Sequence, residues 1–172
     1  MSYRILISIL VCLVILGCGK SEWVQFSPDD AGFAVLMPGE PKSAVQDVQT
    51  AIGSLQLNLF GYNTADAYLA VAYTDYPQSH IDSVAVAEFL YTVREGMLEG
   101  VGGVLQEETE ISLNGYPGRS IVATVSEKNA KIYARLFLVG NRLCQILMVE
   151  ENTTHDETDR IRFFDSFRLL DR

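Results

Sequence analysis

The sequence predicts an α+β fold in which an antiparallel sheet is covered by helices, an α/β/α sandwich. Three observations lead to this prediction. Short apolar segments bounded by turn residues recur along most of the chain, which is the pattern of antiparallel strands. Helical periodicity occurs in one long segment and in one short segment near the end. The 172 residues correspond to one ordinary domain with a single core.

The first half of the domain is expected to be built from strands. In order they are Trp23–Phe26, Gly32–Met37, Val48–Ile52, Leu55–Gly61 and Tyr68–Thr74. The turn residues between Ser27 and Asp30 separate the first two strands. Gly53-Ser54 is of the type that forms a II′ turn, so it is expected to join the next two strands as a hairpin. The last strand is apolar on both faces, as in the middle of a covered sheet.

A single long helix is expected over Ser83–Glu99. Its apolar residues are spaced 4, 3 and 4 positions apart and predict one face packed on a core. These residues are Val86, Leu90, Val93 and Met97. Asp82 is placed as an N-cap, and the glycines from Gly100 to Gly103 are expected to end the helix. These glycines follow a helix, so they are not a phosphate-binding loop, which precedes one.

The second half of the domain is expected to form an antiparallel meander followed by a short helix. The strands are Val104–Leu113, Arg119–Ser126, Lys131–Val139 and Leu143–Glu150. The helix is expected from about His155 to Asp165, with Thr154 and Glu157 as a capping box. It is expected to bury Ile161 and Phe164.

The order of these elements, together with three short segments, resembles bacterial secreted proteins of the Mog1/PsbP-like superfamily. The segments are Phe33-Ala34-Val35-Leu36-Met37-Pro38 leading to Pro41, Gly115-Tyr116-Pro117-Gly118-Arg119, and Phe164-Asp165-Ser166-Phe167-Arg168. The resemblance covers most of the chain, from about Trp23 to Leu170. It implies a binding or assembly protein rather than an enzyme, and it carries no catalytic residue onto this chain.

The N-terminus is expected to direct export and lipidation. Residues 5–17 are 13 uncharged, nearly all apolar residues, fewer than the roughly 20 that span a bilayer as a helix. Ile15-Leu16-Gly17-Cys18 resembles the bacterial lipobox, although Leu16 replaces the usual small residue. The expected organisation is a signal peptide over 1–17, lipidated Cys18 with a short tether over 18–22, and one domain over 23–172. A single-span anchor is the alternative.

This organisation predicts a lipid-anchored protein of the cell envelope. Gly19, rather than aspartate, follows Cys18. By resemblance to sorted lipoproteins, this predicts the periplasmic face of the outer membrane in a Gram-negative cell, and the outer leaflet of the only membrane in a Gram-positive cell. The net charge of -9, from 13 basic and 22 acidic residues, argues against nucleic acid as a partner, because the phosphate backbone requires a basic surface.

The sequence carries no pattern that indicates catalysis, a cofactor or a metal. His80 and His155 are the two histidines; neither lies in a hydrolase motif, and both are expected to be exposed. Cys144 lies in an apolar segment and is expected to be buried and structural. The acidic residues around Glu150 lack the spacing of a calcium loop and are expected to be solvated. Carboxylates brought together by folding could still form a glycosidase pair without leaving a linear motif.

The segment from Tyr73 to His80 is the candidate binding loop, because aromatic, polar and titratable residues share one connection. Its candidate residues are Tyr73, Asp75, Tyr76 and His80. The alternative is a connection whose tyrosines cover the sheet edge. The sequence therefore predicts a membrane-anchored, non-catalytic binding or assembly module with a protein partner. The alternative function is a small-ligand or ion-binding lipoprotein that delivers its cargo to a membrane partner.

Overall fold

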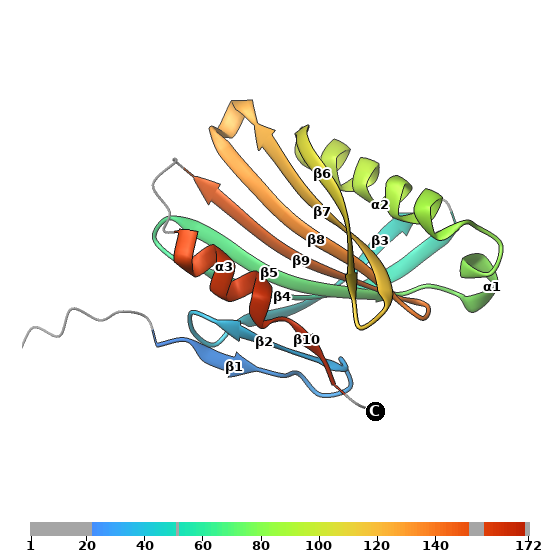
Figure 1. Ribbon diagram of the computed structural model, residues 1–172, viewed down its shortest axis with the longest axis horizontal. Helices are drawn as coiled ribbons and strands as arrows, with labels where there is room; N and C mark the ends of the chain where they lie inside the picture. The colour runs from blue at the N-terminus through green and yellow to red at the C-terminus, as the bar shows by residue number, and fades with distance from the viewer. Residues whose placement is uncertain (1–21, 51, 152–156, 171–172) are drawn as a thin grey trace, which may run out of the picture.

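The computed structural model describes residues 22–50, 52–151 and 157–170. A seven-stranded antiparallel sheet with the order β3-β4-β5-β9-β8-β7-β6 forms the centre of the molecule (Figure 1). Its strands are β3 (Lys42–Thr50), β4 (Gly53–Asn63), β5 (Ala67–Asp75), β6 (Val104–Leu113), β7 (Tyr116–Val125), β8 (Ala130–Val139) and β9 (Arg142–Glu151). A 3-10 turn, η1 (Ser126–Lys128), joins β7 to β8. The predicted meander from β6 to β9 is confirmed.

One face of this sheet is covered by a second, smaller sheet and a helix. The small sheet has the order β1 (Val24–Phe26), β2 (Phe33–Met37) and β10 (Arg168–Leu169), and α3 (Glu157–Ser166) lies beside it (Figure 1). Phe33 of β2 and Phe163 of α3 are both fully buried against β5 and β9. The antiparallel α+β prediction is correct. Strands nevertheless form more of the fold than the sequence predicts, because a three-stranded sheet, and not helices alone, covers this face.

The opposite face is covered by α2 (Val86–Val101), which packs on β7 and β8. The predicted start of this helix is wrong. The chain first forms a short helix, α1 (Gln78–Ile81), and α2 begins after Ala85, which makes no side-chain cap. Asp82 instead ends α1, where its carboxylate accepts a hydrogen bond from Gln78 Nε2 at 2.8 Å. The glycines end the helix as predicted, but two residues later than expected: Gly100 still lies within α2, and Gly102 caps it with a φ of 65°.

The buried face of α2 also differs from the predicted stripe. Val86 is 37% exposed, whereas Phe89, Leu90 and Leu98 are buried. Arg94, which is not part of the predicted apolar stripe, is buried as well. A charged side chain is tolerated there only because it is paired.

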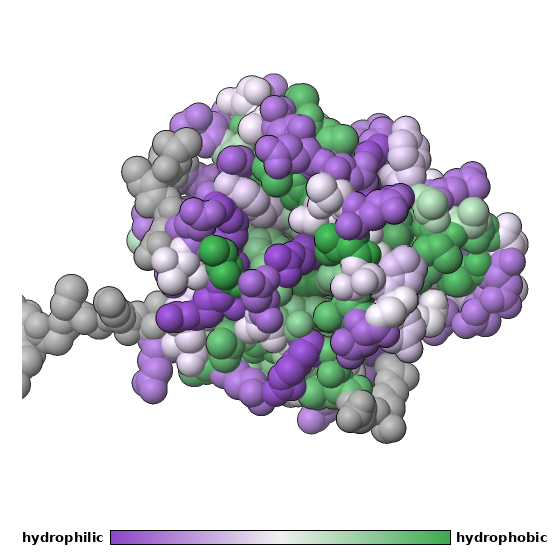
Figure 2. Space-filling view, viewed as in Figure 1, coloured by the Kyte–Doolittle hydropathy of each residue, from purple (hydrophilic) through white to green (hydrophobic). Residues whose placement is uncertain are grey.

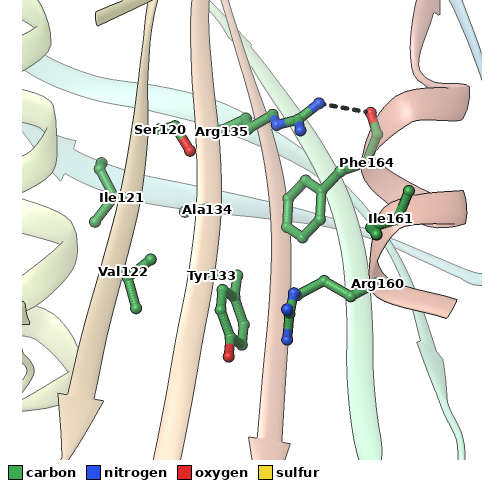
Figure 3. A pocket seen from close by; sticks show the side chains of 9 residues that line it. All are labelled: Ser120, Ile121, Val122, Tyr133, Ala134, Arg135, Arg160, Ile161 and Phe164. Atoms are coloured by element: carbon green, nitrogen blue, oxygen red, sulfur yellow. Dashed lines mark hydrogen bonds between the residues drawn. The ribbon is translucent and has the colours of Figure 1, made fainter. Parts of the chain in front are cut away.

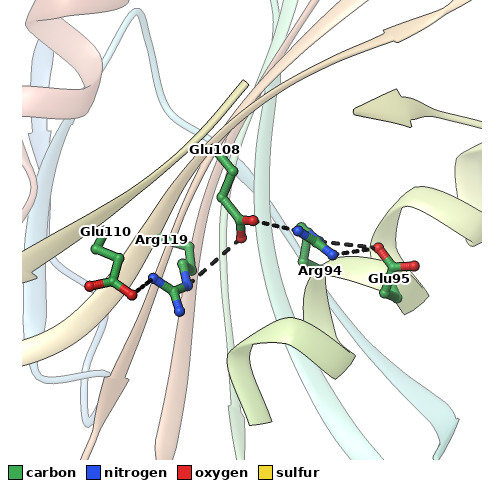
Figure 4. Close-up of polar contacts among 5 residues, drawn as sticks. All are labelled: Arg94, Glu95, Glu108, Glu110 and Arg119. Atoms are coloured by element: carbon green, nitrogen blue, oxygen red, sulfur yellow. Dashed lines mark hydrogen bonds and ion pairs between the residues drawn. The ribbon is translucent and has the colours of Figure 1, made fainter. Parts of the chain in front are cut away.

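The partners of Arg94 connect α2 to the edge strand β6 (Figure 4). Arg94 donates to Glu108 of β6 and, through Nη2, to Glu95 Oε1 at 2.8 Å. Arg119 of β7 continues the chain of charges, with Nε 3.7 Å from Glu108 Oε1 and Nη1 2.5 Å from Glu110 Oε1. Burial alone lowers the pKa of Arg94, but these carboxylates outweigh it and raise the pKa above its ordinary value. The network thus holds β6 against α2, with both arginine charges compensated.

The hairpin of β3 and β4 is present, but its turn lies earlier than predicted. Thr50 pairs with Gly53 and Gln49 with Ser54, so Gly53-Ser54 belongs to β4 rather than to the connection. β3 also begins at Lys42 and not near Val48. Most side chains from Lys42 to Asp47 are polar and all are exposed, so no apolar alternation marks this part of the strand.

The last helix confirms one predicted core residue and contradicts the other. Phe164 is buried, but Ile161 is 52% exposed, and Phe163 takes the second core position. The expected cap at Thr154 and the first residues of the predicted helix lie outside the described residues. Within the described ranges, no helix is long and apolar enough to cross a bilayer.

Candidate functional site

Two adjoining hollows lie where β5 ends and β9 begins. Their volumes are ≈ 560 and ≈ 500 Å³, and Gly32, Arg142 and Leu170 line both. We refer to the two together as the Arg142 hollow. Four connections meet around it: residues 27–32 after β1, the end of β5, the β6–β7 turn and the β8–β9 turn. The C-terminal residues after β10 complete its wall.

Arg142 organises this hollow through a dense set of contacts. It begins β9 directly opposite Asp75, the last residue of β5. Its Nε and Nη2 donate to the two carboxylate oxygens of Asp75 at 2.6 and 2.7 Å. Its Nη1 donates to the carbonyl oxygens of Ala31 and Asp30 at 2.6 and 3.0 Å. The guanidinium carbon lies 4.1 Å from the centre of the Tyr73 ring, within cation–π range.

These contacts define what Arg142 can do chemically. Four of the five N–H groups of a guanidinium are engaged by these bonds. The hydrogen bonds to Asp75 raise the pKa of Arg142 above its ordinary value, and this effect exceeds the lowering by burial. The side chain is therefore a fixed cation that fastens the loop before β2 to the end of the sheet, and its charge is balanced by Asp75.

The remaining polar groups come from tight turns. Asn114 and Gly115 have φ values of 52° and 85°, as in the type I′ turn that Asn-Gly favours, and Tyr116 follows them on the wall of the hollow. Asn141 in the β8–β9 turn donates from Nδ2 to the carbonyl oxygen of Tyr76 at 2.7 Å. The Asn-Gly pair is a local turn signal, but nothing local indicates that these turns meet.

The four residues of the predicted binding loop lie on two sides of the sheet end. Tyr73 and Asp75 belong to β5 and lie beside Arg142. Tyr76 and His80 instead pack toward α2, where the Tyr76 ring lies edge-on to Phe89 at 4.8 Å between centres. The His80 ring stacks on Tyr76 at 6.1 Å. Asp75 thus lines the Arg142 hollow, Tyr73 contacts Arg142 from the core side, and Tyr76 and His80 do not line the hollow.

The titratable groups of this loop differ from their expected surroundings. His80 is part of α1 and is half-buried, not an exposed loop residue. Burial raises the pKa of the Tyr76 phenol above its ordinary value of 10.0. Cys144, next to Arg142 in the fold, is 1% exposed among apolar side chains, which confirms the predicted buried position.

The other chemistry-bearing residues of the prediction lie apart from the Arg142 hollow or outside the described residues. In the part of the chain that the structure describes, no group of three or more His, Cys, Asp or Glu is suitably placed. The expectation that Glu150 is solvated is wrong, because it is 7% exposed and lies 3.6 Å from Arg160 Nη1. His155 lies outside the described residues.

A smaller pocket of ≈ 140 Å³ lies between α3 and strands β7 and β8 (Figure 3). Arg135 and Arg160 flank it, and the Arg160 guanidinium lies 4.2 Å from the centre of the Tyr133 ring. Both cations are already compensated: Arg135 lies 3.0 Å from Asp165 Oδ1, and Arg160 lies 3.1 Å from Glu157 Oε1. The pocket therefore has little uncompensated positive charge with which to bind an anion.

Comparison with known proteins identifies the fold. No protein-family model matches the chain, and no curated protein matches it in sequence. Among solved structures, it is similar to the cyanobacterial PsbP protein of Synechocystis sp. PCC 6803, with a TM-score of 0.57, 15% identity, and coverage of 90% of this chain and 96% of that one. A protein of unknown function from Pseudomonas aeruginosa matches with a TM-score of 0.42, 12% identity, and coverage of 74% and 82%. The chain has a Mog1/PsbP-like fold.

Proposed function

We propose that this protein is a lipid-anchored, non-catalytic binding or assembly module of the bacterial cell envelope, acting on a protein partner. The observation that carries the binding role is the convergence of four connections around Arg142, held in place by its hydrogen bonds to Asp75, Asp30 and Ala31. Connections presented on a rigid scaffold are where binding residues concentrate.

The chemistry of the hollow favours binding over catalysis. Acid–base catalysis needs a group that can take up and release a proton near the reacting atoms. Asp75 is engaged at both oxygens by Arg142, and the buried Cys144 thiol lies within the core. The other polar side chains that line the hollow are those of Ser27, Asp29, Asp30, Asn114, Asn141 and Tyr116, which can recognise polar surfaces through hydrogen bonds.

Membrane attachment is supported by the sequence before the domain. Ile15-Leu16-Gly17-Cys18 resembles a lipobox, and β1 begins at Val24. The six peptide units between Cys18 and Val24 extend at most roughly 20 Å. An anchor on Cys18 thus keeps the domain close to the bilayer. Hydrophilic and hydrophobic side chains are interspersed on the face seen in Figure 2. Such a mixed surface is compatible with a domain that lies in water beside the bilayer.

A small-ligand-binding lipoprotein is the second candidate. It is favoured by the size of the hollows, ≈ 560 and ≈ 500 Å³, because small-molecule sites commonly measure about 300–1,000 Å³. The mixed polar lining matches a polar ligand better than an apolar one.

A pull-down from detergent-solubilised membranes tests the proposal. The full-length chain is compared with Tyr116→Ser, which alters the wall of the hollow. Tyr91→Ser on α2 is the matched control, because Tyr91 and Tyr116 are 53% and 39% exposed and lie on different elements. We expect a stoichiometric protein partner with the wild type and Tyr91→Ser, and its loss with Tyr116→Ser. A bound small molecule without a protein favours the second candidate. If neither a protein nor a small molecule is recovered, both candidates are contradicted.

A further inference from the structure

The two edges of the seven-stranded sheet are built differently. The edge strand β6 has a register break between Leu105 and Glu107, and Glu108 and Glu110 connect it to arginines. The edge strand β3 pairs with β4 through nine consecutive residues without a break, and the other side of β3 pairs with nothing in the described chain. Bulges and charges are the devices that keep edge strands from pairing with other chains, and β3 has few of them.

The side chains of β3 also favour pairing. It carries two charges, Lys42 and Asp47, and no proline. Val45 is 64% exposed, more than any other exposed large apolar side chain of the described residues. A β-branched residue in an extended strand packs well against a cross-strand neighbour. Its exposure on an unpaired edge indicates an interface.

We infer that β3 pairs antiparallel with β3 of a second copy of this chain, about a twofold axis normal to the sheet at Val45. Directly opposite residues of an antiparallel pair lie on the same face of the sheet. A twofold axis normal to the sheet keeps each face continuous across the two copies. Only registers that pair two even or two odd positions of β3 satisfy this condition, because successive side chains alternate between faces.

Charge and shape select one of these registers. Centring the axis on Asp47 places two carboxylates opposite each other, which is unfavourable. Centring it on Gln46 places Val45 opposite Asp47 of the second copy. Centring it on Val45 places the two valines together and puts Ser43, a hydroxyl donor, opposite Asp47 of the second copy. In this register no like charges meet.

The same symmetry agrees with attachment to one membrane, a step that rests on the proposed function. The small sheet that contains β1 covers the face of the large sheet opposite α2 (Figure 1). A twofold axis normal to the sheet leaves both β1 strands on the same side of the dimer. One bilayer on that side can therefore hold an anchor from each copy.

Cysteine cross-linking tests the register. In the full-length chain purified in detergent, Val45→Cys should form an intermolecular disulfide under mild oxidation. Opposite residues of an antiparallel pair have Cα atoms about 4.5–5.5 Å apart, within the disulfide range of about 4.4–6.8 Å. Asp47→Cys is the matched control: the two introduced thiols are offset by four residues, about 13 Å along the strands, and should not cross-link. The wild type gives the background from its own cysteines.

Oligomeric mass provides the second test. Sedimentation of the wild type should give a dimer, and Val45→Lys, at an exposed position, should give a monomer that is still folded and unfolds cooperatively. A monomeric wild type at the highest attainable concentration overturns the inference, as does a dimer that Val45→Lys leaves intact and Val45→Cys does not cross-link. The Cys18→Ala variant separates this inference from the proposed anchor, because it should still dimerise. A wild-type dimer that carries no lipid would support the β3 pairing and contradict the proposed attachment.

Discussion

Arg142 is the residue on which the shape of the candidate site depends most. It joins three segments that are far apart in sequence, and its side chain is 13% exposed. Replacing it with alanine leaves the carbonyl oxygens of Ala31 and Asp30 and the Asp75 carboxylate without this donor. We expect Arg142→Ala to lower the free energy of unfolding by about 1–3 kcal/mol.

Urea unfolding measures this change. Lys128→Ala is the matched control, because Lys128 is an exposed cation on η1, and surface changes of this kind usually stay within about 0.5 kcal/mol. If both variants lose the same small amount of stability, the contacts of Arg142 do not organise the hollow.

Tyr76 gives the fold a dependence on alkaline pH. Burial raises its pKa in the folded protein above the ordinary value of 10.0. The stability from keeping this phenol neutral is therefore complete below about pH 10 and is lost as the pH rises through the folded-state pKa. We expect Tyr76→Phe to show a smaller fall in unfolding free energy between about pH 8 and about pH 11 than the wild type. Identical falls in the two proteins would contradict this assignment.

Among the helices and strands, α2 contains one residue, Gly96, whose replacement is expected to stabilise the helix. Gly96 lies inside the helix, and a Cβ added there would have no heavy atom within 4 Å. Gly96→Ala is expected to raise the unfolding free energy by about 0.5–1 kcal/mol, because alanine loses less conformational freedom than glycine.

The contrasting position is Gly102, whose φ of 65° is left-handed. An L-residue is disfavoured there by about 1–2 kcal/mol, so Gly102→Ala should destabilise the protein. Thermal or urea unfolding of both variants checks the pair. A loss of stability in Gly96→Ala would show that the flank of α2 is not open as described.

The elements that could be predicted are those with a buried face or a strong end signal. β5 is apolar on both faces, and Gly102 ends α2 as expected. The first half of β3 could not be predicted, because an edge strand with both faces exposed has no apolar alternation. β10 has two residues, too few for any period. Asp82 resembles an N-cap because local signals do not distinguish the end of one helix from the start of the next.

At the scale of the whole molecule, the candidate site could be predicted only in part. Tyr73 and Asp75 are predictable because titratable and aromatic residues share a segment; Asp75 lines the hollow, and Tyr73 contacts Arg142. Arg142 is not, because its partners are distant: its bond to Ala31 spans 111 residues of sequence. A single sequence reports local period and turn chemistry, whereas the meeting of four connections depends on strand order.

The proposed function depends most on lipidation at Cys18, because an anchor there would decide where the domain can act. Metabolic labelling with a palmitate analogue, followed by membrane fractionation, tests it most directly. We expect the wild type to be labelled and to sediment with membranes, and Cys18→Ala to be unlabelled. A wild type without label, or a Cys18→Ala variant that is labelled and fractionates like the wild type, would contradict the claim.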